Sequence, residues 1–223
     1  YNVEPYVYLP IENPTISENL SQIRKQFWIS NTKDTEICSV ENTTKPLEFF
    51  MRVSDLPTRC IASLNFDGLE ATGSENWIFL LRAEASFAVG DVSNGKRLLA
   101  SAKDGTGKDY VTAKLLFSQG EYEKALEILL PLKEVKTIGG FAHLMSGQIY
   151  EAMGLKSAAL KEYYISTQKQ KEWSMPWLLA SRLHLEFSNF DLARTSIELA
   201  EKLNGADINT KAARSQYNSY RYQ

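Results

Sequence analysis

Apolar side chains recur at helical spacing through most of residues 76–219 of this 223-residue chain. They predict helices over 76–89, 91–103, 109–118, 121–133, 138–152, 156–170, 176–187, 190–203 and 207–219. Pro131 falls near the end of one predicted helix and Pro176 near the start of another, where a proline costs least. The pattern therefore predicts a mainly α-helical protein.

A short motif recurs in this helical region, in which a glycine is followed two residues later by an aromatic residue and five residues later by alanine. Its fullest copy is Gly120-x-Tyr122-x-x-Ala125, and related copies begin 34 residues on at Gly154 and a further 34 on at Ser188. A weaker copy begins 30 residues upstream, at Gly90. A period of this length indicates repeated helix–turn–helix units.

When the four copies are aligned on their turn positions, three further positions show the same kind of residue in every copy, and each set of aligned residues is called a column. Seven residues before each turn position the side chain is small: Ala83, Ala113, Gly147 and Ser181. Nine residues after it the side chain is large: Leu99, Leu129, Tyr163 and Ile197. Ten residues before it stand Leu80, Tyr110, Leu144 and Leu178. A small column is needed where the two helices of a unit cross closely, so these columns support the repeat.

The chain resembles the tetratricopeptide repeat family through these motifs, over roughly residues 74–205. It departs from the family pattern at Gly95, where alanine is expected, and at Ser188, which replaces a turn glycine. The resemblance implies a solenoid in which each helix pair buries its apolar face by stacking on the next pair.

The repeat divides the chain into three regions. Residues 73–205 hold the repeats, and residues 206–223 are expected to form a C-terminal capping helix or tail. Residues 1–72 do not fit the repeat and combine a proline-rich extended segment, an amphipathic helix over 17–28 and short strand-compatible runs. We expect a helical solenoid with a small irregular or α+β N-terminal module.

The resemblance also implies a concave groove lined by the first helix of each pair, suited to a protein or peptide partner. The groove positions predicted by phase are Trp77, Leu80, Phe87, Tyr110, Lys114, Phe117, Phe141, Leu144 and Arg182. Only Lys114 and Arg182 could serve a clamp for a partner's terminal carboxylate, so that clamp is not supported. An aromatic groove suits an amphipathic helix or an extended apolar segment. The alternative is that several of these aromatic residues pack the core between repeats.

Composition and charge narrow the function classes. The chain is 43% hydrophobic and 23% charged, as in ordinary globular proteins, and its formal charge is −2. This balance gives no general attraction to nucleic acid, and no apolar run approaches the roughly 20 residues that span a bilayer. The groove partner is therefore expected to be protein, with no nucleic acid and no membrane insertion.

No motif indicates an enzyme, a metal site or a cofactor. His143 and His184 lie in separate predicted helices, and Gly105-Thr106-Gly107-Lys108 lacks the strand and the upstream glycine of a phosphate loop. Cys38 and Cys60 match no metal signature. They form either a disulfide, if the chain lies in an oxidising compartment, or two reduced thiols.

These observations lead to two hypotheses for function. The first is a non-enzymatic scaffold that holds a partner during assembly of a bacterial envelope machine for secretion, pili or motility. The second is an extracytoplasmic sensory domain of a membrane-integrated transcription activator, suggested by the segment from Gly147 to Gly154. The chain starts at Tyr1, without Met, as in a processed product or a piece of a longer protein. We therefore expect a periplasmic location, with a cytoplasmic one as the alternative.

Overall fold

A computed structural model describes residues 76–205 and 208–221 of the chain. The chain divides into two compact units, Tyr1–Leu115 (unit 1) and Leu116–Gln223 (unit 2), and each is described by itself. The predicted N-terminal module and the predicted Cys38–Cys60 disulfide lie outside the described residues, so both stay predictions.

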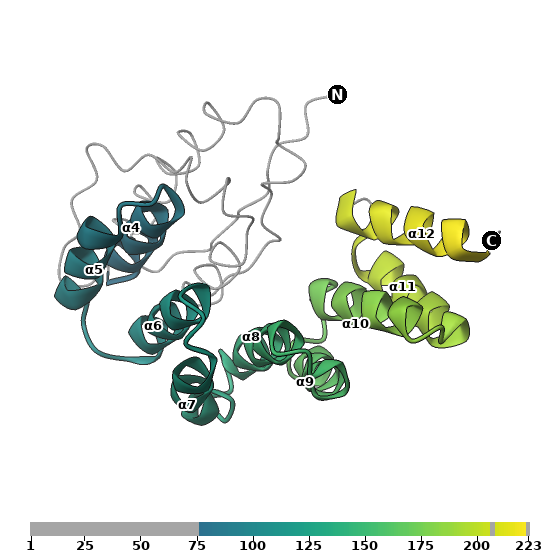
Figure 1. Cartoon of the computed structure of the whole chain (residues 1–223), viewed down its shortest axis with the longest axis horizontal. Coiled ribbons are helices and arrows are strands. Elements are labelled where there is room, and N and C mark those ends of the chain that lie inside the picture. Colours follow the sequence, from purple (N-terminus) through teal and green to yellow (C-terminus); the bar gives the residue numbers. More distant parts are fainter. Residues whose placement is uncertain (1–75, 206–207, 222–223) are drawn as a thin grey trace, which may run out of the picture. The chain divides into compact units, whose positions relative to one another are not determined.

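The described residues form nine helices and no strand (Figure 1). The helices are α4 (Asn76–Ala88), α5 (Val92–Ser101), α6 (Thr106–Ser118), α7 (Tyr122–Leu132), α8 (Gly139–Ala152), α9 (Lys156–Lys169), α10 (Met175–Glu186), α11 (Phe190–Asn204) and α12 (Ile208–Arg221). The structure confirms each predicted helix, with both ends within three residues of the prediction. This mainly helical architecture is consistent with a tetratricopeptide-like repeat fold.

Short left-handed turns join the two helices of each pair. The turn residues Gly90, Gly120 and Gly154 have φ values of +83°, +77° and +79°, and Ser188 occupies the same position with φ +59°. A left-handed residue ends a helix by directing the chain away from it, and glycine adopts this conformation without a steric cost. The recurring turn position therefore marks the break between the first and second helix of each pair.

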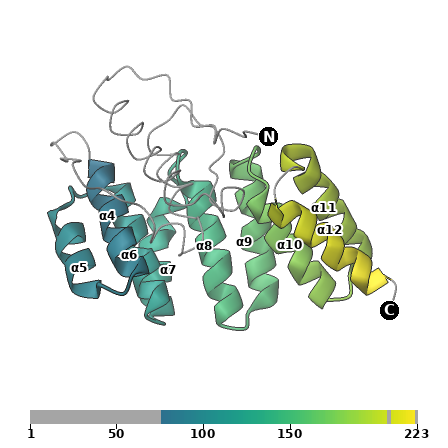
Figure 2. The same ribbon diagram turned by 90° about the horizontal axis from the view of Figure 1, so that it is seen from above.

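In unit 2, the pair α8 and α9 is held by a close approach of the two helices, which run in opposite directions in Figure 2. Gly147 on α8 faces the ring of Tyr163 on α9, and a β-carbon on Gly147 would lie 2.4 Å from Cε1 of that ring. Both residues are buried. The small column and the large column predicted from the sequence thus meet at this contact.

The helices α10, α11 and α12 pack beside one another at the C-terminal end of unit 2 (Figure 1). Leu185, Ala193, Ile197 and Tyr217 form one apolar cluster. Arg214 on α12 donates two hydrogen bonds to Glu201 on α11, with Nε–Oε1 and Nη2–Oε2 distances of 2.8 and 2.6 Å. This geometry suits a helix that caps the α10–α11 pair.

The small column tolerates a polar residue in α10. Ser181 is buried, and its hydroxyl donates to the carbonyl of Leu178 on the same helix at 2.7 Å. Because this bond satisfies the hydroxyl within α10, serine can stand where the other pairs have alanine or glycine.

Candidate interaction surface

The structure places four of the predicted groove residues in the packed interior. Leu80 and Tyr110 are buried in unit 1, and Phe141 and Leu144 are buried in unit 2. Phe141 packs against Trp173 with ring centroids 4.6 Å apart. These positions follow the alternative kept open above, that groove-phase residues pack the core, and their contact with a partner stays a prediction.

The other predicted groove residues are more exposed or lie outside the described part. Phe87, Lys114, Phe117 and Arg182 are partly exposed, whereas the side chain of Trp77 lies outside the described residues. Phe117 contacts Tyr122 across the α6–α7 turn, with ring centroids 6.0 Å apart. Phe87 and Lys114 belong to unit 1, and Phe117 and Arg182 belong to unit 2. A continuous strip across both units therefore stays a prediction.

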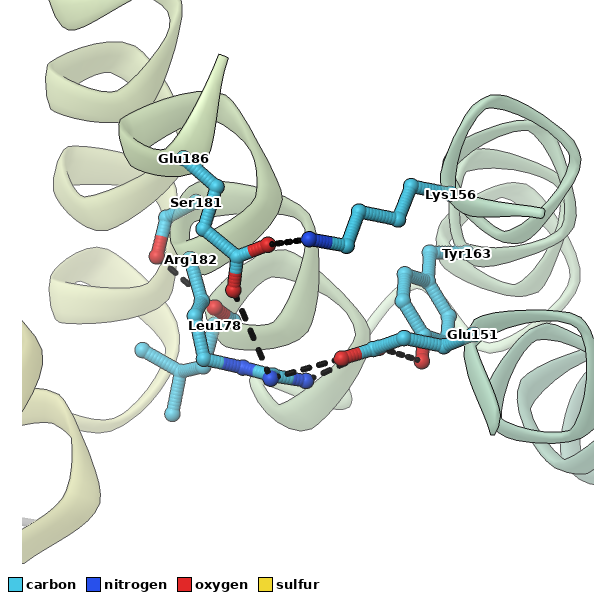
Figure 3. Close-up of polar contacts among 7 residues, drawn as sticks. All are labelled: Glu151, Lys156, Tyr163, Leu178, Ser181, Arg182 and Glu186. Carbon is cyan, nitrogen blue, oxygen red and sulfur yellow. Dashed lines mark hydrogen bonds and ion pairs between the residues drawn. The ribbon is translucent and has the colours of Figure 1, made fainter. Parts of the chain in front are cut away.

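Arg182 on α10 is the centre of a polar network that joins three helices (Figure 3). Its guanidinium holds the carboxylate of Glu151 on α8, with Nη1–Oε1 and Nη2–Oε2 distances of 2.6 and 2.9 Å. The hydroxyl of Tyr163 on α9 donates to Oε2 of the same carboxylate at 2.8 Å. Two donors thus fix Glu151, and Glu151 in turn fixes Arg182.

A second pair of charges borders this network. Nζ of Lys156 on α9 lies 2.8 Å from Oε2 of Glu186 on α10, and Oε1 of Glu186 lies 3.9 Å from Nη1 of Arg182 (Figure 3). With Glu151, the network contains two acidic and two basic side chains, so its charges balance.

Burial and the neighbouring carboxylate shift the ionisation of Tyr163. Desolvation is the largest cause that raises the pKa of its phenol, and the hydrogen bond to Glu151 raises it further. The phenol therefore stays protonated at neutral pH and remains a hydrogen-bond donor to Glu151.

Unit 1 contains a related ion pair between successive first helices. Nζ of Lys114 on α6 lies 2.8 Å from Oε2 of Glu84 on α4, whose side chain is buried. Lys114 remains partly exposed, as Arg182 does in unit 2. In each unit, a carboxylate on a preceding first helix therefore orients a cation on the next one.

The two histidines make different contacts with α9. Nδ1 of His143 lies 2.6 Å from Oε2 of Glu162, and Nζ of Lys133 lies 2.9 Å from Oε1 of the same carboxylate. Burial alone would raise the pKa of Glu162, but the hydrogen bonds from His143 and Lys133 lower it on balance. Nε2 of His184 lies 2.6 Å from the hydroxyl of Tyr164, and burial lowers the pKa of this imidazole.

These histidine contacts are those of packed helices. Within residues 76–205 and 208–221, no three His, Cys, Asp or Glu side chains are grouped so that they could hold a metal ion. In the same part of the chain, no helix has the length and apolar character needed to cross a bilayer.

The hydroxyl of Tyr163 has a role that its position in the repeat pattern did not predict. The residue stands in the column of large side chains with Leu99, Leu129 and Ile197, and it is the one member with a polar atom. A buried hydroxyl needs a partner, so this exception could have indicated a polar contact. Glu151 shares the predicted groove phase, but its pairing with Arg182 depends on how α8 and α10 pack.

No protein-family model and no curated protein matches the chain. A solved structure described as MamA AMB-1 C2221 aligns with 84% of this chain and 99% of its own, at 13% sequence identity and a TM-score of 0.43. A likeness this low carries no inference about partner or activity.

Proposed function

We propose that this protein is a non-enzymatic scaffold that binds a segment of a partner protein on the faces formed by its first helices. The observation that carries the proposal is Arg182, which is fixed across α8 and α10 by Glu151 while 40% of its side chain stays exposed. A side chain already held in one orientation loses less conformational entropy when a partner binds.

The balanced charge of the network bears on the partner's chemistry. Two N–H groups of Arg182 are directed to Glu151, and a guanidinium has five. The other donors can reach neutral acceptors such as main-chain carbonyl oxygens, whereas a partner carboxylate would meet Glu151 and Glu186 as well as the cation. We therefore expect a neutral or apolar segment, not a free carboxylate terminus.

The wider setting remains a proposal based on the sequence. We retain assembly of a bacterial envelope machine as the process served and the periplasm as the location. The aromatic concave groove as the binding site is part of the same proposal. Its partly exposed members are Phe87 and Lys114 in unit 1 and Phe117 and Arg182 in unit 2, and each unit is proposed to bind through its own first-helix face.

Site-specific photo-crosslinking in the cells of origin tests this function. A photoreactive residue at Gln148, on the same face of α8 as Glu151, should form an adduct of one defined mass. The matched position is Lys161, exposed on the second helix α9, which should form none. Arg182→Ala should reduce the Gln148 adduct more than tenfold. Equal adducts from both positions, or an adduct that Arg182→Ala leaves unchanged, would contradict the proposal.

A further inference from the structure

Large apolar side chains are exposed at two neighbouring turns of unit 2. Leu155 lies in the α8–α9 turn, and Phe187 and Phe190 flank the α10–α11 turn; these three form the turn-edge patch. Each is between 39% and 49% exposed. Exposed apolar residues that gather in one place, instead of being scattered singly, are typical of an interaction site.

An ion pair holds the two turns side by side. Lys156 follows Leu155 directly, Glu186 precedes Phe187 directly, and their Nζ and Oε2 atoms lie 2.8 Å apart (Figure 3). The α8–α9 turn therefore lies beside the C-terminal end of α10, which Phe187 follows directly. The patch belongs to the turn edge of unit 2, so it differs from the first-helix faces of the proposed function.

The backbone between the two phenylalanines adopts a costly conformation. Ser188 is the one non-glycine residue with a positive φ in the part of the chain that the structure describes. A side chain in the left-handed region costs about 1 kcal/mol or more relative to glycine, which the other pairs have at this position. Such positions cluster at functional sites, which agrees with a binding role for this turn.

The charges around the patch indicate what can cover it. Lys156 pairs with Glu186, and Nη2 of Arg194 lies 3.7 Å from Oδ1 of Asp191. Two acidic and two basic side chains leave no net charge to attract a polyanion or a polycation. A complementary partner therefore presents an apolar, uncharged strip.

The spacing of the turns suits a helix as that partner. The helices α9 and α10 pack against each other. Packed helices lie about 8–10 Å apart, and seven residues of an α-helix rise about 10.5 Å. We propose that the turn-edge patch docks an amphipathic helix of a partner protein, whose apolar side chains seven residues apart contact Leu155 on one turn and Phe187 and Phe190 on the next.

A synthetic peptide tests this site without knowledge of the natural partner. The probe is a fluorescein-labelled amphipathic helix with leucines at heptad spacing and Glu and Lys elsewhere, titrated with the full chain by fluorescence anisotropy. A control peptide has the same composition with leucines at alternate positions, which removes the helical apolar face. We expect the heptad peptide to bind at least tenfold more tightly than the control peptide.

Variants locate the binding. The double variant Phe187→Ser with Phe190→Ser should weaken binding of the heptad peptide at least tenfold, because apolar anchors dominate such contacts. The matched variant Leu203→Ser removes an exposed leucine from the far end of α11 and should leave binding unchanged. If the double variant loses helical circular dichroism, Leu155→Ser takes its place with an expected loss of at least threefold.

Three outcomes would overturn the proposal. The first is equal binding of both peptides, and the second is binding that none of the patch variants weakens. The third is a concentration-dependent dimer in sedimentation velocity that Phe187→Ser with Phe190→Ser dissociates, because the patch would then be covered by a second copy. None of these outcomes bears on the Arg182 face, so failure here is distinguishable from failure of the proposed function.

Discussion

Two helix pairs, α4/α5 in unit 1 and α8/α9 in unit 2, each bring an aromatic ring against a glycine of the partner helix, with the helix roles exchanged. In α8/α9 the glycine is Gly147 on the first helix and the ring is Tyr163 on the second. In α4/α5 the ring is Phe87 on the first helix and the glycine is Gly95 on the second. An added β-carbon would lie 2.4 Å from Cε1 of Tyr163 or 2.3 Å from Cε1 of Phe87.

The two rings differ in their freedom to move. Tyr163 is fully buried and its hydroxyl is held by Glu151, whereas Phe87 is partly exposed. Replacing each glycine by alanine should therefore lower the free energy of unfolding by different amounts, although the two distances are nearly equal. A clash is relieved when the ring can rotate into solvent, but it remains as strain when the ring cannot move. The surroundings of the ring, more than the distance, decide how strictly glycine is required.

The largest effect is expected from Gly147→Ala. Alanine gains about 1 kcal/mol of helix propensity, but the clash with a fixed ring costs about 3 kcal/mol, leaving a net loss of about 2 kcal/mol. Urea unfolding followed by tryptophan fluorescence measures it, since Trp173 and Trp177 lie in unit 2. Gly154→Ala is the control, because its β-carbon meets open space and only the left-handed backbone opposes it, at about 1 kcal/mol. A loss for Gly147→Ala no larger than the control's would contradict the close-approach argument.

Tyr163→Phe should have an intermediate effect. It keeps the ring against Gly147 but removes the donor to Glu151, and a hydrogen bond to a charged group contributes about 1.5 kcal/mol. The same unfolding measurement applies, and the variant should also loosen Arg182, seen as broader guanidinium proton resonances. Unchanged stability together with an unchanged Arg182 signal would show that the hydroxyl does not hold the network.

The helices could be predicted from the sequence because their evidence is local. Apolar residues at helical spacing located every described helix to within three residues, and the turn residues with the small column seven positions earlier marked the helix pairs within residues 76–205. The same column also predicted close approach at Gly147, which its contact with Tyr163 bears out. The apolar periodicity locates helices well because every repeat must meet the same packing requirement at its turn and on its buried face.

Which residues form the surface could not be predicted as well as the helices, because the helical phase of a residue does not determine whether its side chain is exposed. Phe141 and Leu144 share the phase of Arg182, yet both are buried and Phe141 packs on Trp173, which lies in the loop before α10. The Glu151–Arg182 pair spans 31 residues and depends on how successive first helices pack. The departure at Gly95 was visible as an irregularity, but its cause, the ring of Phe87, required the structure.

The smallest effect is expected from Gly95→Ala, despite the shorter distance to its ring. Phe87 can rotate toward solvent, so the cost of displacing it should roughly cancel the gain of about 1 kcal/mol in helix propensity. We expect a net change within about 0.5 kcal/mol, measured by hydrogen exchange of the α5 amides, which reports unit 1 separately. Adding Phe87→Leu removes the ring, so Gly95→Ala should stabilise α5 in that background. A loss for Gly95→Ala as large as that for Gly147→Ala would show that Phe87 is as fixed as Tyr163, and distance alone would then account for both pairs.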